Sequence, residues 1–474
     1  MSTVTHEQNL SGIKPVPILI AFLIAGFIGL FSETALNMAL GRLMIELDVV
    51  SSTVQWITTG YLLTMGILIP VSALLIQWFS TRQLFVASLL FSIVGAIVSG
   101  MAPTFEVLLL GRIIQAIGTG LLIPLMFNTA LIIFPIHRRG TVMGLIGLVM
   151  MSAPAVGPAT SGLIIEMLSW NWILWLLLPF LVFSLVYGLI FMQNVSTLTK
   201  PKIDVLSIIL STIGFGGLVY GFSLAGDKGW ADVLVISAIL VALTSLIIFS
   251  FRQLKIDNPM LDLRAFKYPM FSLGIFCVAA TFMIILSTMI LLPLYLQIGL
   301  GVTALAAGLV LMPGGALNGI LSLVVGRAFD THGPKWLITP GFIIMLAMLW
   351  NLSNVTTETS TLMIILLHSG LMVGVSLVMM PAQTNGLNQL PRSLYPDGTA
   401  LINTLMQVSG SIGTALAITI MSASQSHFLK SVADPADPTL VSTSLTAGVQ
   451  TAFILGIGLA ASGLVVSFFI KPSR

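Results

Sequence analysis

Two charged side chains lie within long apolar segments of the chain: Glu33 in residues 16–40 and Arg112 in residues 105–134. A charge in hydrocarbon is costly, so each is a functional hypothesis by default. If the first segment runs outward and the fourth inward, Glu33 lies roughly 12 Å and Arg112 roughly 10 Å below one membrane surface. We expect the two side chains to meet there. The opposing effects of desolvation and of a neighbouring guanidinium would let this carboxylate bind and release a proton.

Each of these charges also has a structural interpretation. Arg112 can extend towards the outer headgroups by snorkelling. Glu33 can belong to a static ion pair. A third titratable side chain, His368, lies alone in the apolar segment 360–388, where hydrogen-bonded structure is the commoner role.

Several side-chain amides lie within or at the ends of apolar runs. They either line a central cavity, together with Met and Phe side chains, or form hydrogen bonds between helices. Both interpretations stay open for each of Asn37, Gln55, Asn128, Asn318, Asn403 and Gln407.

The fifth apolar segment, 140–164, is rich in helix breakers. Pro154 and Pro158 share one helix face, and Gly157 and Gly162 leave room for a close neighbour. Proline removes backbone hydrogen bonds and bends a helix. The segment is therefore predicted to be a bent, closely packed helix suited to gating.

The composition determines the elements that hold these residues. Hydrophobic residues make up 57% and charged residues 7% of the 474, whereas a soluble domain has about 25% charged residues. We predict an all-α integral membrane protein, since roughly 20 apolar residues cross the hydrocarbon core. Its fourteen spans are 16–40, 52–77, 83–101, 105–134, 140–164, 171–192, 204–226, 232–253, 270–296, 303–328, 335–352, 360–388, 397–423 and 445–470.

The basic residues orient these spans. With the N-terminus in the cytoplasm, 15 of the 19 Lys and Arg fall in inside segments, and Arg42, Lys228 and Lys430 fall outside, with Arg112 within a span. We expect a multi-pass protein of the bacterial inner membrane with both termini cytoplasmic. The inside residues are Lys14, Arg82, Arg138, Arg139, Lys200, Lys202, Arg252, Lys255, Arg264, Lys267, Arg327, Lys335, Arg392, Lys471 and Arg474.

Two inside turns are related by an offset of 253 residues. Ala73, Gln77, Ser80 and Arg82 follow the second span, and Gly326, Asp330, Gly333 and Lys335 follow the tenth. Parallel repeats are common in transporters. We therefore predict six-helix bundles at 1–195 and 269–474, with two inserted helices and their linkers at 196–268.

Other classes of function lack their residues. The sequence has no Gly-Lys pair, hence no phosphate-binding loop, and no spacing of His, Cys and acidic residues typical of a metal site. No catalytic cluster supports a membrane enzyme. We expect no cofactor other than a proton gradient, and no nucleic-acid partner.

At this point five stretches resemble the major facilitator superfamily in its fourteen-helix drug:proton antiporter branch, especially lincomycin-resistance-type exporters. The resemblance spans nearly the whole chain and implies the 6+2+6 fold. The stretches are FSETALNMAL at 31–40, QWITTGYLL at 55–63, GRIIQAIGTG at 111–120, APAVGPATSG at 153–162 and GRAFDTHGPK at 326–335.

The resemblance implies export of lipophilic drugs or amphipathic toxicants in exchange for protons, by a monomer that alternates its access. It places proton binding on Glu33, tuning on Arg112 and gating on the fifth helix. The sequence departs from the family pattern in two places. The acid of the first helix is usually Asp, and Gln77 replaces the acid of the first turn, so only Asp330 keeps it.

The sequence is compatible with three other functions. One is a dedicated exporter of a single endogenous metabolite on the same fold. The others are a polytopic membrane enzyme and a channel.

Overall fold

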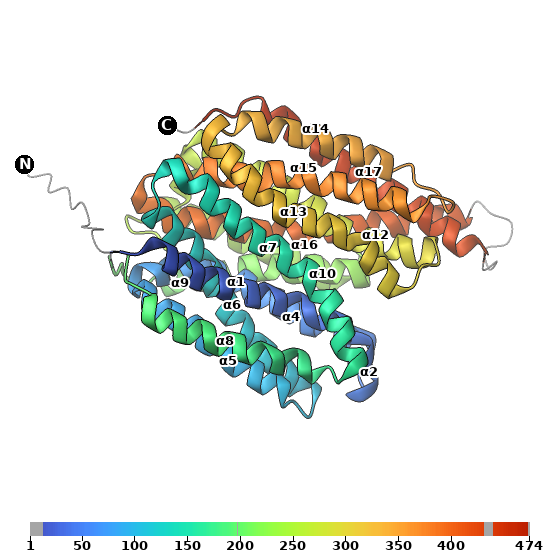
Figure 1. The fold of residues 1–474 in the computed structure, drawn as a ribbon, viewed down its shortest axis with the longest axis horizontal. Helices are drawn as coiled ribbons and strands as arrows, with labels where there is room; N and C mark the ends of the chain where they lie inside the picture. Colours follow the sequence, from blue (N-terminus) through green and yellow to red (C-terminus); the bar gives the residue numbers. More distant parts are fainter. Residues whose placement is uncertain (1–12, 197, 431–438, 473–474) are drawn as a thin grey trace, which may run out of the picture.

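The computed structural model describes residues 13–196, 198–430 and 439–472, and within these ranges the chain is helical with no strand. The helices lie roughly side by side along one direction (Figure 1). They are α1 (Pro15–Ala35), η1 (Leu36–Ala39), α2 (Leu40–Glu46), α3 (Ser51–Val54), α4 (Trp56–Trp78), α5 (Thr81–Gly100), α6 (Phe105–Ile133), α7 (Ile136–Met167), α8 (Asn171–Phe191), α9 (Val205–Ser211), η2 (Thr212–Gly216), α10 (Gly217–Lys228), α11 (Val233–Lys255), η3 (Leu263–Lys267), α12 (Pro269–Leu294), η4 (Tyr295–Gly299), α13 (Ala304–His332), α14 (Lys335–Leu352), α15 (Thr361–Asn388), η5 (Arg392–Leu394), α16 (Tyr395–Lys430) and α17 (Thr439–Ser467).

The predicted membrane architecture is confirmed. Thirteen helices of the described ranges are long and apolar enough to cross a membrane. The fifth predicted span lies within α7, which has 32 residues and is the fourteenth long helix. The first span is longer than predicted and continues through η1 and α2 to Glu46. The span does not end at residue 40, because Leu43 is buried and Arg42 pairs with Glu46 at 2.8 Å on the exposed side of the same helix.

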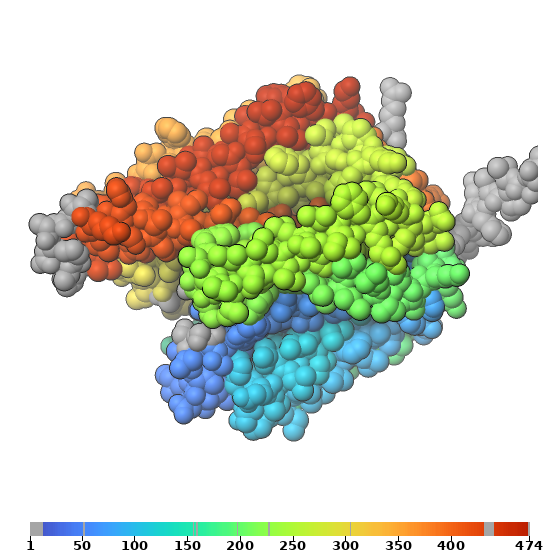
Figure 2. Space-filling model, turned by 180° about the vertical axis from the view of Figure 1, so that it is seen from behind, coloured from blue at the N-terminus to red at the C-terminus, as the bar shows by residue number. Residues whose placement is uncertain are grey.

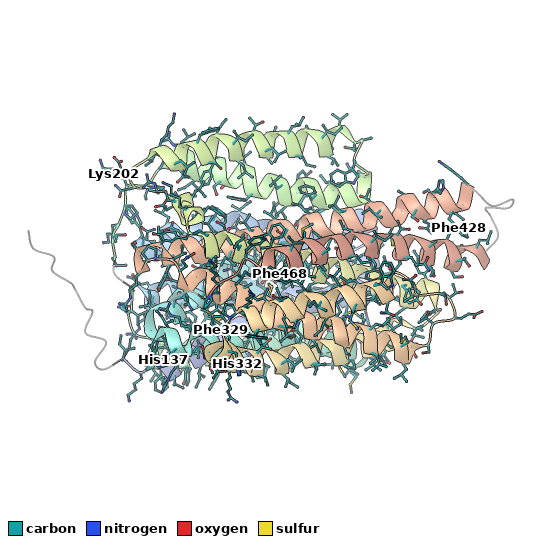
Figure 3. The ribbon with its side chains drawn as sticks, turned by 90° about the horizontal axis from the view of Figure 1, so that it is seen from above. His137, Lys202, Phe329, His332, Phe428 and Phe468 are labelled. Atoms are coloured by element: carbon teal, nitrogen blue, oxygen red, sulfur yellow. The ribbon has the colours of Figure 1, made fainter. Side chains whose placement is uncertain are left out.

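The two ends of the bundle differ in charge. His137, Lys202 and His332 lie at one end and Phe428 at the opposite end (Figure 3). We call the first the basic end; Arg82, Arg138 and Lys335 belong to it as well, each at the start of a helix that leaves it. That this end faces the cytoplasm stays a prediction of the positive-inside rule.

Corresponding helices pack in the same pairs in both halves of the chain. In the N-terminal half α4 and α5 pack on α6, α5 also packs on α8, and α1 packs on α7. In the C-terminal half, in the same order, α13 and α14 pack on α15, α14 also packs on α17, and α12 packs on α16. This is what two copies of one six-helix unit would produce. The halves meet along α7 and α13 and along α4 and α16. The division at residues 195 and 268 stays a prediction.

The related turns end and start helices by different means. After α4, Ser80 begins α5 with a capping box, in which its hydroxyl accepts from the Gln83 backbone and its own backbone donates to the Gln83 side chain. After α13, Gly333 has φ +77°, a conformation that favours glycine. The Gly333 of the predicted motif therefore serves the turn itself.

The inserted helices lie on the outside of the bundle. From behind, their yellow-green band crosses the face between the blue N-terminal and the red C-terminal helices (Figure 2), and from above they stand at one edge (Figure 3). η2 and α10 contact α4, and α10 contacts α16. The pair therefore covers one seam between the two halves.

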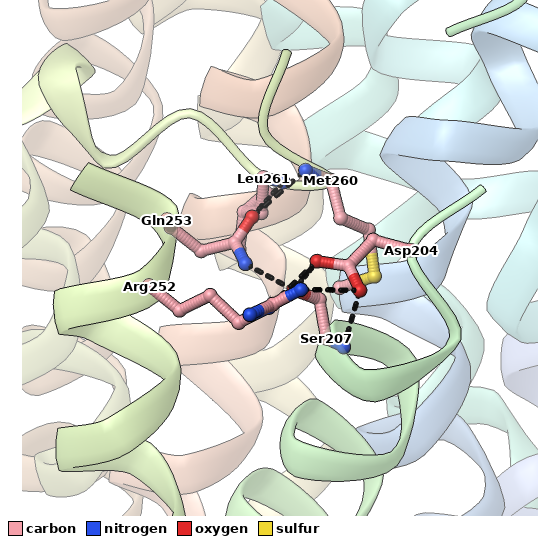
Figure 4. A network of polar contacts seen from close by, with 6 residues as sticks. All are labelled: Asp204, Ser207, Arg252, Gln253, Met260 and Leu261. Carbon is pink, nitrogen blue, oxygen red and sulfur yellow. Dashed lines mark hydrogen bonds and ion pairs between the residues drawn. The ribbon is translucent and has the colours of Figure 1, made fainter. Parts of the chain in front are cut away.

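A polar clasp, formed by Asp204, Ser207, Arg252 and Gln253, fastens these helices at the basic end (Figure 4). Arg252 donates from Nε and Nη2 to the two Asp204 oxygens at 2.8 and 3.0 Å. This forked pair lowers the pKa of Asp204 to about 2. Gln253 donates to Ser207 at 2.6 Å and accepts from the Met260 backbone at 2.8 Å. The clasp thus ties α9 and α11 to the linker that leads to α12.

Candidate transport site

Arg112 is completely buried, with 0% of its surface exposed. Its Nη1 donates to Ser32 Oγ at 3.0 Å and to Gln115 Oε1 at 2.9 Å. Its Nη2 donates to the backbone carbonyl of Glu33 at 3.4 Å. The guanidinium therefore does not extend to the membrane surface, and the snorkelling interpretation is wrong.

An aromatic ring covers the guanidinium. The carbon at the centre of the Arg112 guanidinium lies 4.3 Å from the centroid of the Tyr61 ring, within the range of a cation–π interaction. The Tyr61 hydroxyl lies 2.7 Å from Thr119 Oγ1 and 3.3 Å from the carbonyl oxygen of Gly29, to which it donates. Tyr61 was part of the quoted helix-2 stretch, but the sequence did not indicate this contact.

Glu33 and Arg112 do meet, but through the backbone of Glu33. Within the part of the chain that the structure describes, no ion pair within 4.0 Å joins the two side chains. Arg112 instead donates to the Ser32 hydroxyl and to the backbone carbonyl of Glu33. The Glu33 side chain is partly exposed. The prediction that the two charged side chains meet is therefore wrong. Arg112 contacts the backbone of Glu33, and the Glu33 carboxylate beside it is not ion-paired with it.

The glycines of α7 differ in their surroundings. A Cβ at Gly157 would lie 2.5 Å from Thr34 Oγ1, so Gly157 permits α7 to pack closely on α1 next to Glu33. Gly162 has nothing within 4 Å of that position. Pro154 is partly buried, and the side chain of Pro158 lies outside the described part of the structure. The helix is continuous through both prolines, and its role in gating stays a prediction.

Three of the candidate amides form structural hydrogen bonds. Asn318 on α13 accepts from Ser376 on α15 at 2.6 Å. Asn403 donates to the Thr399 carbonyl one turn earlier at 2.7 Å. Asn37 accepts from Thr58 at 2.6 Å on an exposed part of the first span.

The other three amides behave differently. Asn128 is buried, and its Oδ1 has no hydrogen-bond partner among the described residues. Gln55 and Gln407 are partly exposed. No contact assigns any of the six to a substrate, so their place in a cavity stays a prediction.

At the basic end, Asp330 joins the two halves. Its carboxylate accepts from the backbones of Gly140 and Thr141, both at 2.8 Å, and from the Thr141 hydroxyl at 2.7 Å. Gly326 lies so close to Gly140 that a side chain would collide with the Gly140 carbonyl. The second copy of the turn motif thus holds the start of α7 against α13.

The first copy of the turn contacts a different part of the chain. The Gln77 carbonyl accepts from the backbones of Thr199 and Lys200 at 3.2 and 3.3 Å, and its side chain accepts from the Thr199 hydroxyl. These residues belong to the linker before α9. An acidic side chain at position 77 would therefore lie beside this linker.

Arg139 is the residue at the basic end that sequence reasoning missed. It is 3% exposed and donates to Asn388 and to Tyr395 Oη, both at 2.9 Å. It also donates to the carbonyl oxygens of Leu131 and Phe134, at 2.5 and 3.1 Å. One guanidinium therefore closes the ends of α6, α15 and α16 together. In the sequence it counted only as one of the basic residues that orient the spans.

An apolar groove of about 430 Å³ lies between α1, α7 and α8. Its lining is aliphatic and aromatic, and Phe180 at its edge is 60% exposed. Its residues are Leu23, Ile24, Phe27, Ile28, Phe31, Val149, Ile164, Ile173, Leu176, Leu177 and Phe180.

A buried arginine between the first, second and fourth spans of a repeated six-helix bundle defines a polytopic membrane transporter as the class of protein. The family model described as "Major Facilitator Superfamily" matches residues 22–414. The chain belongs to the Major Facilitator Superfamily, and it is a transporter of small molecules rather than an enzyme.

Curated relatives match over most of the chain. The chain is 60% identical to "Lincomycin resistance protein LmrB" of Bacillus subtilis, over 97% of this chain and 96% of that one. It is 58% identical to the protein of the same name from Listeria monocytogenes, over 99% and 100%. It is 29% identical to "Multidrug export protein EmrB" of Haemophilus influenzae, over 84% and 78%.

Solved structures share the fold. The human organic anion transporter MFSD10 (TETRAN) superposes with a TM-score of 0.62 at 12% identity, covering 96% of this chain and 99% of its own. The proton:xylose symporter XylE has the same TM-score and identity, with 94% of each chain covered. These similarities concern the fold alone.

Proposed function

We propose that this protein exports lincomycin and other lipophilic or amphipathic compounds in exchange for protons, and that Glu33 carries the proton. The observation that carries the proposal is the completely buried Arg112, whose partners are neutral oxygens and a ring. It lies beside Glu33, whose carboxylate has no ion pair within 4.0 Å among the described residues. The likeness to lincomycin resistance proteins supports the choice of substrate.

Neutral groups provide the direct contacts that hold the arginine, and no acid lies within 4.0 Å of it in the described part of the chain. A buried charge is tolerated when hydrogen bonds satisfy it, and Ser32, Gln115 and the Tyr61 ring do this for Arg112. Because these contacts do not require the Glu33 carboxylate, that group can gain or lose a proton without collapse of the site. A static ion pair would not leave this freedom.

Alternating access requires that the halves separate and close at each end in turn. Here Asp330 and Arg139 close the basic end, and the bonds that they form are few and local. We propose that breaking these bonds opens the site to the cytoplasm. Protonation of Glu33 and binding of the substrate would bias the two states, with the protein in the bacterial membrane and both termini cytoplasmic.

The central experiment uses purified protein in liposomes with an imposed pH gradient. Glu33→Gln keeps the shape of the side chain but cannot release a proton, so we expect lincomycin binding to persist while gradient-driven transport falls to the rate of protein-free liposomes. Glu106→Gln, an exposed acid at the start of α6, is the matched control and should transport like the parent. Coupled transport that survives in Glu33→Gln would refute the role of this residue.

Substrate range needs a separate measurement. A resistance panel in an efflux-deficient host distinguishes a drug exporter from an exporter of one metabolite. We expect raised resistance to lincomycin and to at least one unrelated lipophilic compound. Resistance to none of them would favour the dedicated exporter.

A further inference from the structure

His368 lies within one helical turn of the place in the C-terminal half that corresponds to Arg112 in the N-terminal half. Each lies seven residues after the first residue of its helix, Phe105 for α6 and Thr361 for α15. These two helices correspond in the repeat, since α6 packs on α4 and α5 as α15 packs on α13 and α14.

The neighbours of the two residues correspond as well. Tyr61 on α4 covers the Arg112 guanidinium, and Gly314 on α13 lies against the His368 imidazole. Tyr61 and Gly314 are 253 residues apart, which is the offset of the two turn motifs. A Cβ at position 314 would collide with the ring, 2.9 Å from Nε2 and closer to Cδ2, so glycine makes the room for the imidazole.

The imidazole is buried and incompletely bonded. His368 is 6% exposed, and its Nδ1 has no hydrogen-bond partner among the described residues. One turn further along, Asn318 contacts Met372 and accepts from Ser376, so the seam between α13 and α15 continues as a polar line. A histidine with a purely structural role would be expected to use both nitrogens.

No charged group of the packed helices lies at its level in the described part of the chain. Helix α12 has no Asp, Glu, Lys, Arg or His, and its titratable side chain is the buried Cys277. The charged and titratable residues of the other neighbouring helices lie near their ends: Arg327, Asp330 and His332 on α13, Lys335 on α14, His137, Arg138, Arg139 and Glu166 on α7, and Tyr395, Asp397, His427 and Lys430 on α16. Glu358 precedes α15 and is exposed.

We propose that His368 is a second proton-binding site of this transporter, located in the C-terminal half. The inference rests on the proposed function, since it extends proton coupling from Glu33 to a second residue. In the conformation described here, a charge on the imidazole would be buried without a counter-ion, which is costly, whereas the neutral ring is not. When the two halves separate and water reaches His368, Nδ1 can accept a proton. Histidine is the side chain whose ordinary titration falls near neutral pH.

The direct test observes the histidine itself. The full chain is labelled with ¹³C and ¹⁵N in its histidines, reconstituted in lipid nanodiscs and followed by NMR from pH 5 to 8. The signal absent from His368→Gln is that of His368. We expect it to titrate within this range and its midpoint to shift when lincomycin is added. A signal that keeps the neutral form at every pH, with and without lincomycin, would overturn the proposal.

Transport gives the second readout. His368→Gln should keep lincomycin binding and lose the part of the pH dependence of efflux between about pH 5.5 and 7.5, around the ordinary pKa of histidine. Gly314→Ala, which displaces the ring, should show the same loss, and the exposed His427→Gln should not. An unchanged pH profile in His368→Gln would contradict the proposal. Glu33→Gln, measured in parallel, tests the proposed function separately.

Discussion

Two arginines of this protein have opposite surroundings. Arg252 at the basic end is 38% exposed and forms a forked ion pair with Asp204. Arg112 between the first and fourth spans is completely buried and is bound by neutral oxygens and a ring. The exposed arginine thus has the acid, and the buried arginine has none within ion-pair distance among the described residues.

Under the proposed function, this difference distinguishes a structural ion pair from a site whose charge changes during transport. A forked pair of arginine and carboxylate is strong and specific in geometry, and it holds α9 and α11 in one arrangement. Around Arg112 neutral partners provide the hydrogen bonds, and we propose that this leaves the carboxylate of Glu33 available for a proton. The following predictions test this contrast, from the largest expected effect to the smallest.

The first substitution exchanges each arginine for lysine. Lysine cannot reproduce the planar fork, so Arg112→Lys loses at least one hydrogen bond to a charged group, about 1.5–3 kcal/mol. We expect gradient-driven efflux to fall roughly 10- to 100-fold. Arg252→Lys should transport like the parent, because the clasp lies outside the site. Efflux is measured in liposomes. An equal loss of efflux in Arg112→Lys and Arg252→Lys would show that the two arginines do not differ in their importance for transport.

A third acid, Asp330, binds backbone donors rather than an arginine. Asp330→Asn removes the charge that assists three bonds to the start of α7, which is worth about 2 kcal/mol. The ratio of closed to open basic ends should fall about 30-fold. Spin labels on α7 and α13 would report this as a longer distance, and replacing Cys277, the one cysteine of the chain, prepares the background.

The control for this prediction is Gln77→Asn at the corresponding turn, which contacts the linker and not the other half. It should leave the distance distribution unchanged. A distribution that is the same in Asp330→Asn and in the parent would show that Asp330 does not close the basic end.

Gln115→Glu makes the surroundings of Arg112 similar to those of Arg252. The new carboxylate replaces an oxygen that lies 2.9 Å from Nη1 and gives the guanidinium a counter-ion. We expect efflux to fall about tenfold, since one close charge pair is worth more than 1.4 kcal/mol at this depth. Efflux against pH is the measurement, with Gln77→Glu at the basic end as control. Full activity in Gln115→Glu would mean that the neutral partners are not required.

The smallest effect concerns stability. Asp204→Asn breaks the clasp and should lower the free energy of unfolding by about 1 kcal/mol at pH 7, a modest value because Arg252 is more than a third exposed. The pKa of Asp204 is lowered in the folded state, so this stability is present above its ordinary value near 3.8 and is lost as the pH falls towards 2. In thermal unfolding, the stability difference between the parent and Asp204→Asn should therefore be smaller at pH 3 than at pH 7. The exposed Asp257→Asn should unfold like the parent at both pH values.

The sequence predicted the helices well because lipid imposes a simple rule on length and composition. It also placed Glu33 and Arg112 at one depth, since helical rise and orientation fix depth. It did not predict that Arg112 binds the backbone of Glu33 and the Tyr61 ring, because the direction of a side chain around a helix depends on packing. The clasp was missed because Asp204 and Arg252 lie 48 residues apart at the ends of two spans. Arg139 was treated as a surface charge, and only the fold buries it.

The central claim is that the Glu33 carboxylate exchanges a proton when substrate binds. Calorimetry of lincomycin binding in buffers of different ionisation enthalpy counts the protons released per ligand. We predict that Glu33→Gln releases about one proton fewer than the parent, with similar affinity. An equal count in the two proteins would contradict the claim.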